Sequence, residues 1–174
     1  IINEKSLKNA LACDMALGAD GLVILVCQRD SSVEEPAKGD IYTVGVTAKI
    51  KQLVKTEDGV YRTLMEPVAR TEITDFYRVG KYAIAEGLEK TAEYTGVYEE
   101  DQAVLREIRK TVAEISSLLP MFSDDVYAQV NRTKDISLLC DFLAANIIAD
   151  IEKRQELLEI FNPEQRAVAL LTEL

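Results

Sequence analysis

Two apolar runs follow one another early in the chain: Gly21-Leu22-Val23-Ile24-Leu25-Val26-Cys27 and Val44-Gly45-Val46-Thr47-Ala48-Lys49-Ile50-Lys51-Gln52-Leu53-Val54-Lys55. The first holds six consecutive apolar residues, which predicts a central strand that is buried on both faces. The second run alternates between apolar and polar residues. A period of two with cations on one side predicts a strand with one solvent-exposed face. We expect Thr47 to face the solvent, and the core to receive Val44, Val46, Ala48, Ile50 and Val54.

The rest of the first half predicts a sheet with one helix. Asn3 is expected to cap a helix that runs to about Leu17. Asp58-Gly59 is a hairpin turn signal, and it is followed by a long strand from Val60 to Tyr77 with a bend or bulge at Pro67. A further strand is expected at 81–89.

The periodicity changes at Tyr98, where apolar residues begin to recur at helical spacing. We expect one long helix up to Pro120, followed by shorter helices capped by Ser123, Asp135, Asp150 and Asn162. The last of these begins with Asn162-Pro163-Glu164-Gln165, which combines an N-cap, proline at N1 and glutamine at N3. The fold class is therefore α+β: residues 1–95 form a mixed sheet or partial barrel with one helix, and residues 96–174 form a helical bundle. We expect the last helix to be truncated at Leu174.

Short motifs occur along the chain in a defined order: Gln28-Arg29-Asp30, Glu34-Glu35-Pro36, Asp40-Ile41-Tyr42, Ala48-Lys49-Ile50-Lys51-Gln52, Met65-Glu66-Pro67-Val68-Ala69-Arg70, Arg154-Gln155-Glu156-Leu157-Leu158-Glu159 and Asn162-Pro163-Glu164-Gln165-Arg166. Together they resemble the N-terminal domain of the Lon ATP-dependent proteases over nearly the whole chain. Pro67 stands where that family usually has glycine. The resemblance implies a PUA-like fold for the first unit and an additional strand just upstream of Ile1, so that the first strand is expected to be missing here.

The same resemblance implies a function. The implied function is substrate recognition and assembly: the domain captures unfolded or damaged proteins for a cytoplasmic, homo-hexameric serine protease. In that family ATP and Mg belong to a downstream AAA+ module and the Ser-Lys site to a downstream protease module. This chain itself is then not an enzyme and has no cofactor. The alternative is a stand-alone ligand- or protein-binding module of the same fold without protease activity.

The residue inventory limits the chemistry. The chain has no histidine, which excludes Ser-His-acid triads and histidine-ligated metals. No glycine-rich phosphate loop occurs, although composition alone leaves a Ser-Lys dyad open. A net charge of −10 argues against direct nucleic-acid binding, and no apolar run is long enough to cross a bilayer. The three cysteines, Cys13, Cys27 and Cys140, are interpreted as inert buried residues in a reducing cytosol.

A few residues have both a structural and a functional interpretation. Glu34-Glu35 is an exposed acidic loop or a weak cation site. Arg29 and Arg70 pair with nearby acids or hold a peptide carboxylate. Met121 and Phe122 lie between two helices, where they either pack under the bundle or capture protein substrates through apolar contact and not through charge. They are the substrate-contact candidates, and no catalytic, cofactor-binding or metal-binding residue is expected.

Overall fold

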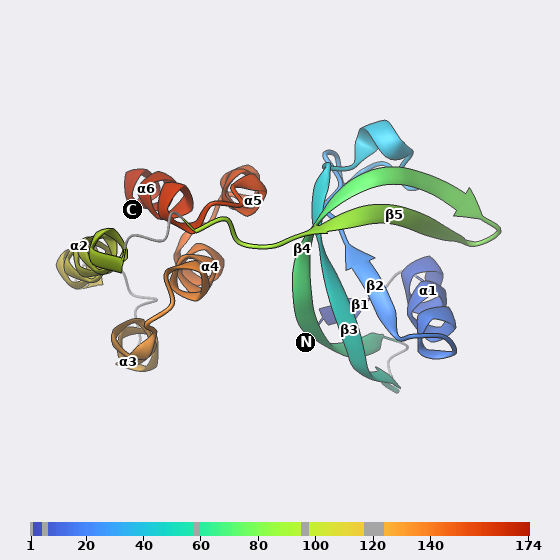
Figure 1. Ribbon diagram of the computed structural model, residues 1–174. Coiled ribbons are helices and arrows are strands. Elements are labelled where there is room, and N and C mark those ends of the chain that lie inside the picture. Colours follow the sequence, from blue (N-terminus) through green and yellow to red (C-terminus); the bar gives the residue numbers. More distant parts are fainter. Residues whose placement is uncertain (1, 5–6, 58–59, 95–97, 117–123) are drawn as a thin grey trace. The chain divides into compact units, whose positions relative to one another are not determined.

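The structure is a computed structural model that describes residues 2–4, 7–57, 60–94, 98–116 and 124–174. These residues form two compact units, Ile1–Thr91 and Ala92–Leu174, which are described separately below (Figure 1). The first unit is a sheet with one α-helix, and the second is helical throughout its described residues. The predicted α+β fold is confirmed.

The sheet of the first unit contains β1 (Ile2–Glu4), β2 (Leu22–Leu25), β3 (Val44–Lys55), β4 (Tyr61–Val79) and β5 (Tyr82–Lys90). The strand order is β1-β4-β3-β2, with β5 also paired to β4. All four of these pairings are antiparallel, where a mixed sheet was expected. The helix α1 (Leu7–Leu17) packs against β2, β3 and β5, and a short 3-10 helix, η1 (Lys38–Asp40), lies in the loop before β3.

The bulge predicted at Pro67 is present. Thr47 pairs with Ala69 and Ala48 pairs with Pro67, so that Val68 is the extra residue on β4. Proline suits such a position because it has no N–H group to donate to the sheet.

Two expectations for the first unit, at Asn3 and at β2, were wrong. Asn3 lies in β1 (Ile2–Glu4) and α1 spans Leu7–Leu17, so Asn3 is part of a strand and not of a helix start. β2 is at the end of the strand order and Leu22 is 39% exposed, so the apolar run forms an edge strand and not a central one. An apolar run reports side-chain hydrophobicity, and it does not report how many neighbouring strands the tertiary fold supplies.

The central strand is β3, which lies between β2 and β4. The consecutive residues Thr47 and Ala48 are both buried, so both faces are covered there and Thr47 does not reach the solvent as expected. Val54 was expected in the core but is 42% exposed. The cause is a second register shift between Ile50 and Gln52, which reverses the alternation in the last part of the strand.

The helical unit contains α2 (Tyr98–Ser116), α3 (Asp124–Arg132), α4 (Ile136–Ile147), α5 (Ile151–Glu159) and α6 (Pro163–Glu173). The predicted N-caps Asp135, Asp150 and Asn162 are confirmed, because each side chain accepts backbone N–H groups from the first turn of its helix. The expectations at Ser123 and Pro120 fall outside the described residues.

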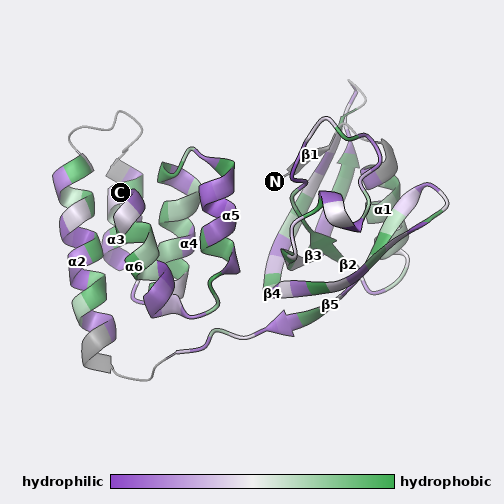
Figure 2. Ribbon diagram, turned by 90° about the horizontal axis from the view of Figure 1, so that it is seen from above, coloured by the Kyte–Doolittle hydropathy of each residue, from purple (hydrophilic) through white to green (hydrophobic). Residues whose placement is uncertain are grey.

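One core joins the helices of this unit. It is formed by the buried side chains of Leu105, Ile108, Val112, Val130, Ile136, Leu139, Cys140, Leu143, Ile148, Leu157, Ala167 and Leu170. The hydropathy of the helices fits their positions in this core. Figure 2 shows that α4 is apolar over most of its length, while α2 alternates between polar and apolar positions. α4 packs against α2, α5 and α6, whereas α2 has one face for the core and one for the solvent.

Candidate functional site

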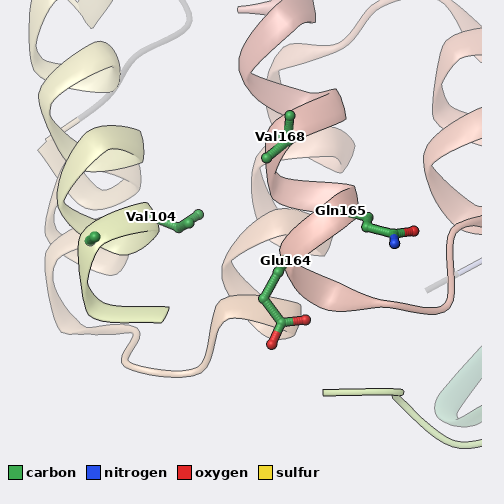
Figure 3. A pocket seen from close by; sticks show the side chains of 5 residues that line it. Val104, Glu164, Gln165 and Val168 are labelled. Carbon is green, nitrogen blue, oxygen red and sulfur yellow. The ribbon is translucent and has the colours of Figure 1, made fainter. Parts of the chain in front are cut away.

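A groove on the helical unit is the candidate functional site, and it lies between α2 and α6 (Figure 3). Its volume is about 530 Å³, and it is a shallow hollow that is open to the solvent. The lining is mainly apolar and comes from Ala103, Val104, Glu164, Gln165 and Val168. Val168 is 57% exposed, so an apolar side chain on α6 is open to an incoming partner.

The local sequence explains why these side chains line the groove. On α2, Leu105 and Ile108 are buried in the core, which leaves Ala103 and Val104 at the margin of the helix interface. On α6, Glu164 and Val168 are four residues apart and therefore lie on one face of the helix. Figure 3 shows Val104 directed from α2 toward α6, with Glu164 and Val168 one turn apart opposite it.

A buried arginine holds α6 in place. Arg166 is 1% exposed, and its guanidinium donates to the carbonyl oxygens of Ile160 (2.9 Å) and Phe161 (3.3 Å). It also donates to the Ser137 hydroxyl (2.9 Å) and the Asp141 carboxylate (3.1 Å), both on α4. These bonds tie the groove wall on α6 to α4.

A second set of contacts fixes the end of the groove at which α6 begins. Asn162, the N-cap of α6, donates through its side-chain amide to the carbonyl oxygen of Glu93 (2.7 Å). The Tyr94 hydroxyl donates to Asp135, the N-cap of α4 (3.2 Å). Partial burial and then the Asp135 carboxylate raise the pKa of Tyr94 above its ordinary value. The segment before α2 is thereby anchored to the first turns of α4 and α6.

The residues selected from the sequence are not gathered at this groove. Met121 and Phe122 lie outside the described residues, so their role stays a prediction. Glu34 and Glu35 are exposed, and the described part of the chain contains no cluster of three or more acidic or cysteine side chains able to hold a metal ion. Arg29 lies over the ring of Tyr42, 4.5 Å from its centroid, so it is held by an aromatic contact.

The predicted burial of Cys27 was wrong. It was expected to be buried and inert, but the structure places it beyond the end of β2 with an exposed side chain, while Cys13 and Cys140 are buried as expected. Because the apolar run continues through Val26 to Cys27, the sequence does not signal that the strand ends at Leu25.

Sequence reasoning missed the groove itself. Glu164 was interpreted as part of a helix start, and Val104 belongs to the apolar residues that recur at helical spacing after Tyr98. Neither reading was wrong locally, but only the packing of α2 beside α6 brings the two side chains together.

Comparison with known proteins identifies the family. The sequence model for the ATP-dependent protease La (LON) substrate-binding domain matches residues 2–174. The chain belongs to this family. The Lon resemblance stated from the sequence is therefore confirmed, over almost the full length of the chain.

Relatives of the Lon substrate-binding domain agree with this assignment. The chain is 33% identical to the Lon protease of Geobacter metallireducens over 157 residues, which is 89% of this chain and 19% of that protein. It is 28% identical to the Lon protease of Endomicrobium trichonymphae over 163 residues, 94% of this chain and 20% of that protein. The chain thus spans about a fifth of the length of these curated relatives.

Solved structures of Lon N-terminal domains share the fold. The N-terminal domain of Mycobacterium avium complex Lon protease superposes with a TM-score of 0.72 at 18% identity, covering 98% of this chain and 87% of that one. The Lon N-terminal domain protein from Xanthomonas campestris gives a TM-score of 0.56 at 12% identity, covering 98% and 88%. Within the described residues, no helix is both long enough and apolar enough to span a membrane.

Proposed function

We propose that this domain recognises protein substrates for an ATP-dependent protease. It binds exposed segments of unfolded or damaged polypeptides and presents them to the protease of which it forms part. The observation that carries this proposal is the match of residues 2–174 to the Lon substrate-binding domain. Unfolded proteins have in common that they expose apolar side chains, and an open apolar groove suits such a ligand.

The parent protein in this proposal is a Lon-type serine endopeptidase. It would be cytoplasmic and homo-hexameric, and it would use ATP and Mg in modules outside these residues. The relatives that carry the name Lon protease are about five times as long as this chain, which leaves room for such modules. The domain contributes binding and assembly, while the bond-breaking chemistry is done elsewhere in the protein.

Weak binding by one copy suits this role. A substrate must be released into the protease after capture, so a micromolar or weaker affinity for each domain is expected. Several copies in one ring raise the effective concentration of the substrate, and avidity then supplies the retention that a single domain lacks.

Met121 and Phe122 are a further part of this proposal. A methionine adapts to partners of different shape, and the phenylalanine adds apolar area, so we propose that the pair contributes to substrate contact. The double variant Met121→Ser/Phe122→Ser is expected to bind an unfolded polypeptide more weakly than the wild-type chain at both low and high salt. Unchanged binding by a folded double variant would contradict this assignment.

The proposed function is tested with the 174-residue chain itself. Fluorescence anisotropy should show binding of a labelled, permanently unfolded protein such as reduced and alkylated lactalbumin, and no binding of its folded, disulfide-bonded form. The same preparation is expected to hydrolyse neither ATP nor casein. Equal affinity for the folded and unfolded forms, or no binding to either, would overturn the proposal.

A further inference from the structure

The segment that leaves the end of β5 is anchored again after only a few residues (Figure 2). β5 ends at Lys90, which is paired with a residue of β4. The next anchored residue is Glu93, whose carbonyl oxygen accepts the side-chain amide of Asn162. Thr91 and Ala92 lie between the two anchors, and both are exposed and belong to neither a strand nor a helix. They are also the last residue of the first unit and the first residue of the second.

Asn162 makes two kinds of contact at once, and its amide group is the reason. The side-chain oxygen accepts the Gln165 N–H (2.7 Å) and caps α6, while the side-chain nitrogen donates to Glu93 (2.7 Å). An aspartate would provide the cap, but an ionised carboxylate has no N–H group to donate. The caps of α4 and α5 are aspartates, Asp135 and Asp150. The amide at the start of α6 therefore adds a bond that capping alone does not require.

Asp135 divides its two carboxylate oxygens in a similar way. Oδ1 accepts the Leu138 N–H (2.8 Å) as the cap of α4, and Oδ2 accepts the Tyr94 hydroxyl (3.2 Å). Because Glu93 and Tyr94 are consecutive, the two bonds hold neighbouring residues of one segment. Both bonds are exposed to the solvent, where a single hydrogen bond adds little net stability. They can therefore break while the helices stay folded.

We propose that these two bonds, Asn162–Glu93 and Tyr94–Asp135, form a clamp that sets the length of the tether between the two units. While the clamp is closed, the tether consists of two exposed residues. When both bonds break, the tether runs through positions 91–97 up to the start of α2. This inference goes beyond the substrate-recognition function proposed above and does not depend on it.

The clamp changes the reach of the tether by a large factor. The closed tether joins Lys90 to Glu93, and the open tether joins Lys90 to Tyr98. An extended chain covers about 3.5 Å per residue, so the reach rises from about 10 Å to about 28 Å. Units joined by an exposed linker are expected to move relative to one another, and the clamp limits that motion.

The two bonds act in series, which gives a specific expectation for variants. Asn162→Asp keeps the cap but removes the donor to Glu93, and Tyr94 then still holds the segment one residue further on. Tyr94→Phe leaves the Glu93 bond in place, so the tether does not lengthen. Only the double variant Tyr94→Phe/Asn162→Asp opens the clamp.

Distances between two spin labels measure this change. One label is attached to the exposed Cys27 of the first unit and the other to Glu152→Cys, at an exposed position of α5. Cys13 and Cys140 are buried, which protects them from the reagent in the folded chain. Double electron–electron resonance should show a distance distribution about twofold wider in the double variant than with the wild-type clamp. Each single variant should match the wild type.

Two controls accompany the double variant. Insertion of Gly-Gly-Ser-Gly-Gly between Thr91 and Ala92 lengthens the tether as much as release of positions 93–97 does, and it should widen the distribution to a similar extent. Tyr127→Phe/Asn131→Asp makes the same chemical changes at exposed residues of α3 and should leave the distribution unchanged. Helical circular dichroism should be equal in all of these variants.

Backbone order parameters test the clamp in the wild-type chain without any substitution. Nitrogen relaxation should give values of about 0.85 for Glu93 and Tyr94 and below about 0.6 for Thr91 and Ala92. Values as low at Glu93 and Tyr94 as at Thr91 and Ala92 would overturn the inference. A double variant as narrow as the wild type beside a widened insertion variant would also overturn it, as would equal widening by the α3 control or no widening by the insertion.

These outcomes are separate from those for the proposed function. Binding of the unfolded protein by the wild-type chain would still support substrate recognition if the clamp were absent. Loss of that binding would leave the distance distributions and order parameters as evidence for the clamp.

Discussion

The hydroxyl groups of Thr47 and Thr71 lie 2.6 Å apart across β3 and β4, and both residues are buried. Two polar side chains in the interior of the first unit thus satisfy each other. We expect Thr47→Val and Thr71→Val each to lower the free energy of unfolding by about 1–3 kcal/mol, because each leaves a buried hydroxyl without this partner. The double variant should lose less than the sum of the two single losses. Urea unfolding in a double-mutant cycle measures this coupling, and strictly additive losses would contradict it.

Gly45 is required where β3 passes β2. A Cβ at this position would overlap the carbonyl oxygen of Leu25 and lie 3.3 Å from Ile24 Cγ2. We expect Gly45→Ala to destabilise the chain by about 1–3 kcal/mol, since backbone cannot move aside as a side chain can. Gly39→Ala is the matched control, because nothing lies within 4 Å of its Cβ position. Thermal unfolding of both variants gives the comparison, and equal melting temperatures would refute the steric argument.

Arg166 should be essential to the helical unit. Its guanidinium meets four acceptors while only 1% exposed, and methionine can fill the space but cannot donate to any of them. We expect Arg166→Met to cost about 2–3 kcal/mol of unfolding free energy. Arg106→Met, at an exposed position of α2, should cost less than about 0.5 kcal/mol. Urea titration followed by helical circular dichroism tests both values. A small loss in Arg166→Met would show that the network adds little net stability.

Tyr94 should make the helical unit sensitive to alkaline pH. Partial burial and the Asp135 carboxylate raise its pKa in the folded chain, so the folded state keeps the phenol proton to a higher pH than the unfolded state. The resulting stabilisation is present below about pH 10 and is lost as the pH rises through the folded-state pKa. The effect should be small, because Tyr94 is 46% exposed.

The measurement for Tyr94 is urea unfolding between pH 8 and pH 11, followed by helical circular dichroism. Tyr94→Phe should show a shallower loss of stability over this range than the wild-type chain. The other tyrosines are present in both proteins, so the difference between the two curves isolates Tyr94. Parallel curves would mean that the contact with Asp135 does not persist in solution.

Local signals in the sequence were sufficient for three helix starts of the helical unit. Asp135, Asp150 and Asn162 were predicted as N-caps and act as N-caps, because capping depends only on a side chain and the next three backbone N–H groups. The bulge at Pro67 was predictable for the same reason, because proline lacks the N–H group for strand pairing and disrupts the pairing at its own position. The ordered motifs also identified the Lon family, which the match over residues 2–174 confirms.

The sequence by itself therefore determined the α+β fold class, the N-caps Asp135, Asp150 and Asn162, and the family, all of which depend on neighbours along the chain. Tertiary structure alone decided that β2 is an edge strand, that Thr47 is buried, and that Cys27 is exposed. It also created the groove, by bringing Val104 of α2 beside Glu164 of α6, sixty positions further along the chain. The physical reason is that burial and pocket formation depend on which elements lie against each residue. Hydrophobic contact depends on proximity in space and not on separation along the sequence.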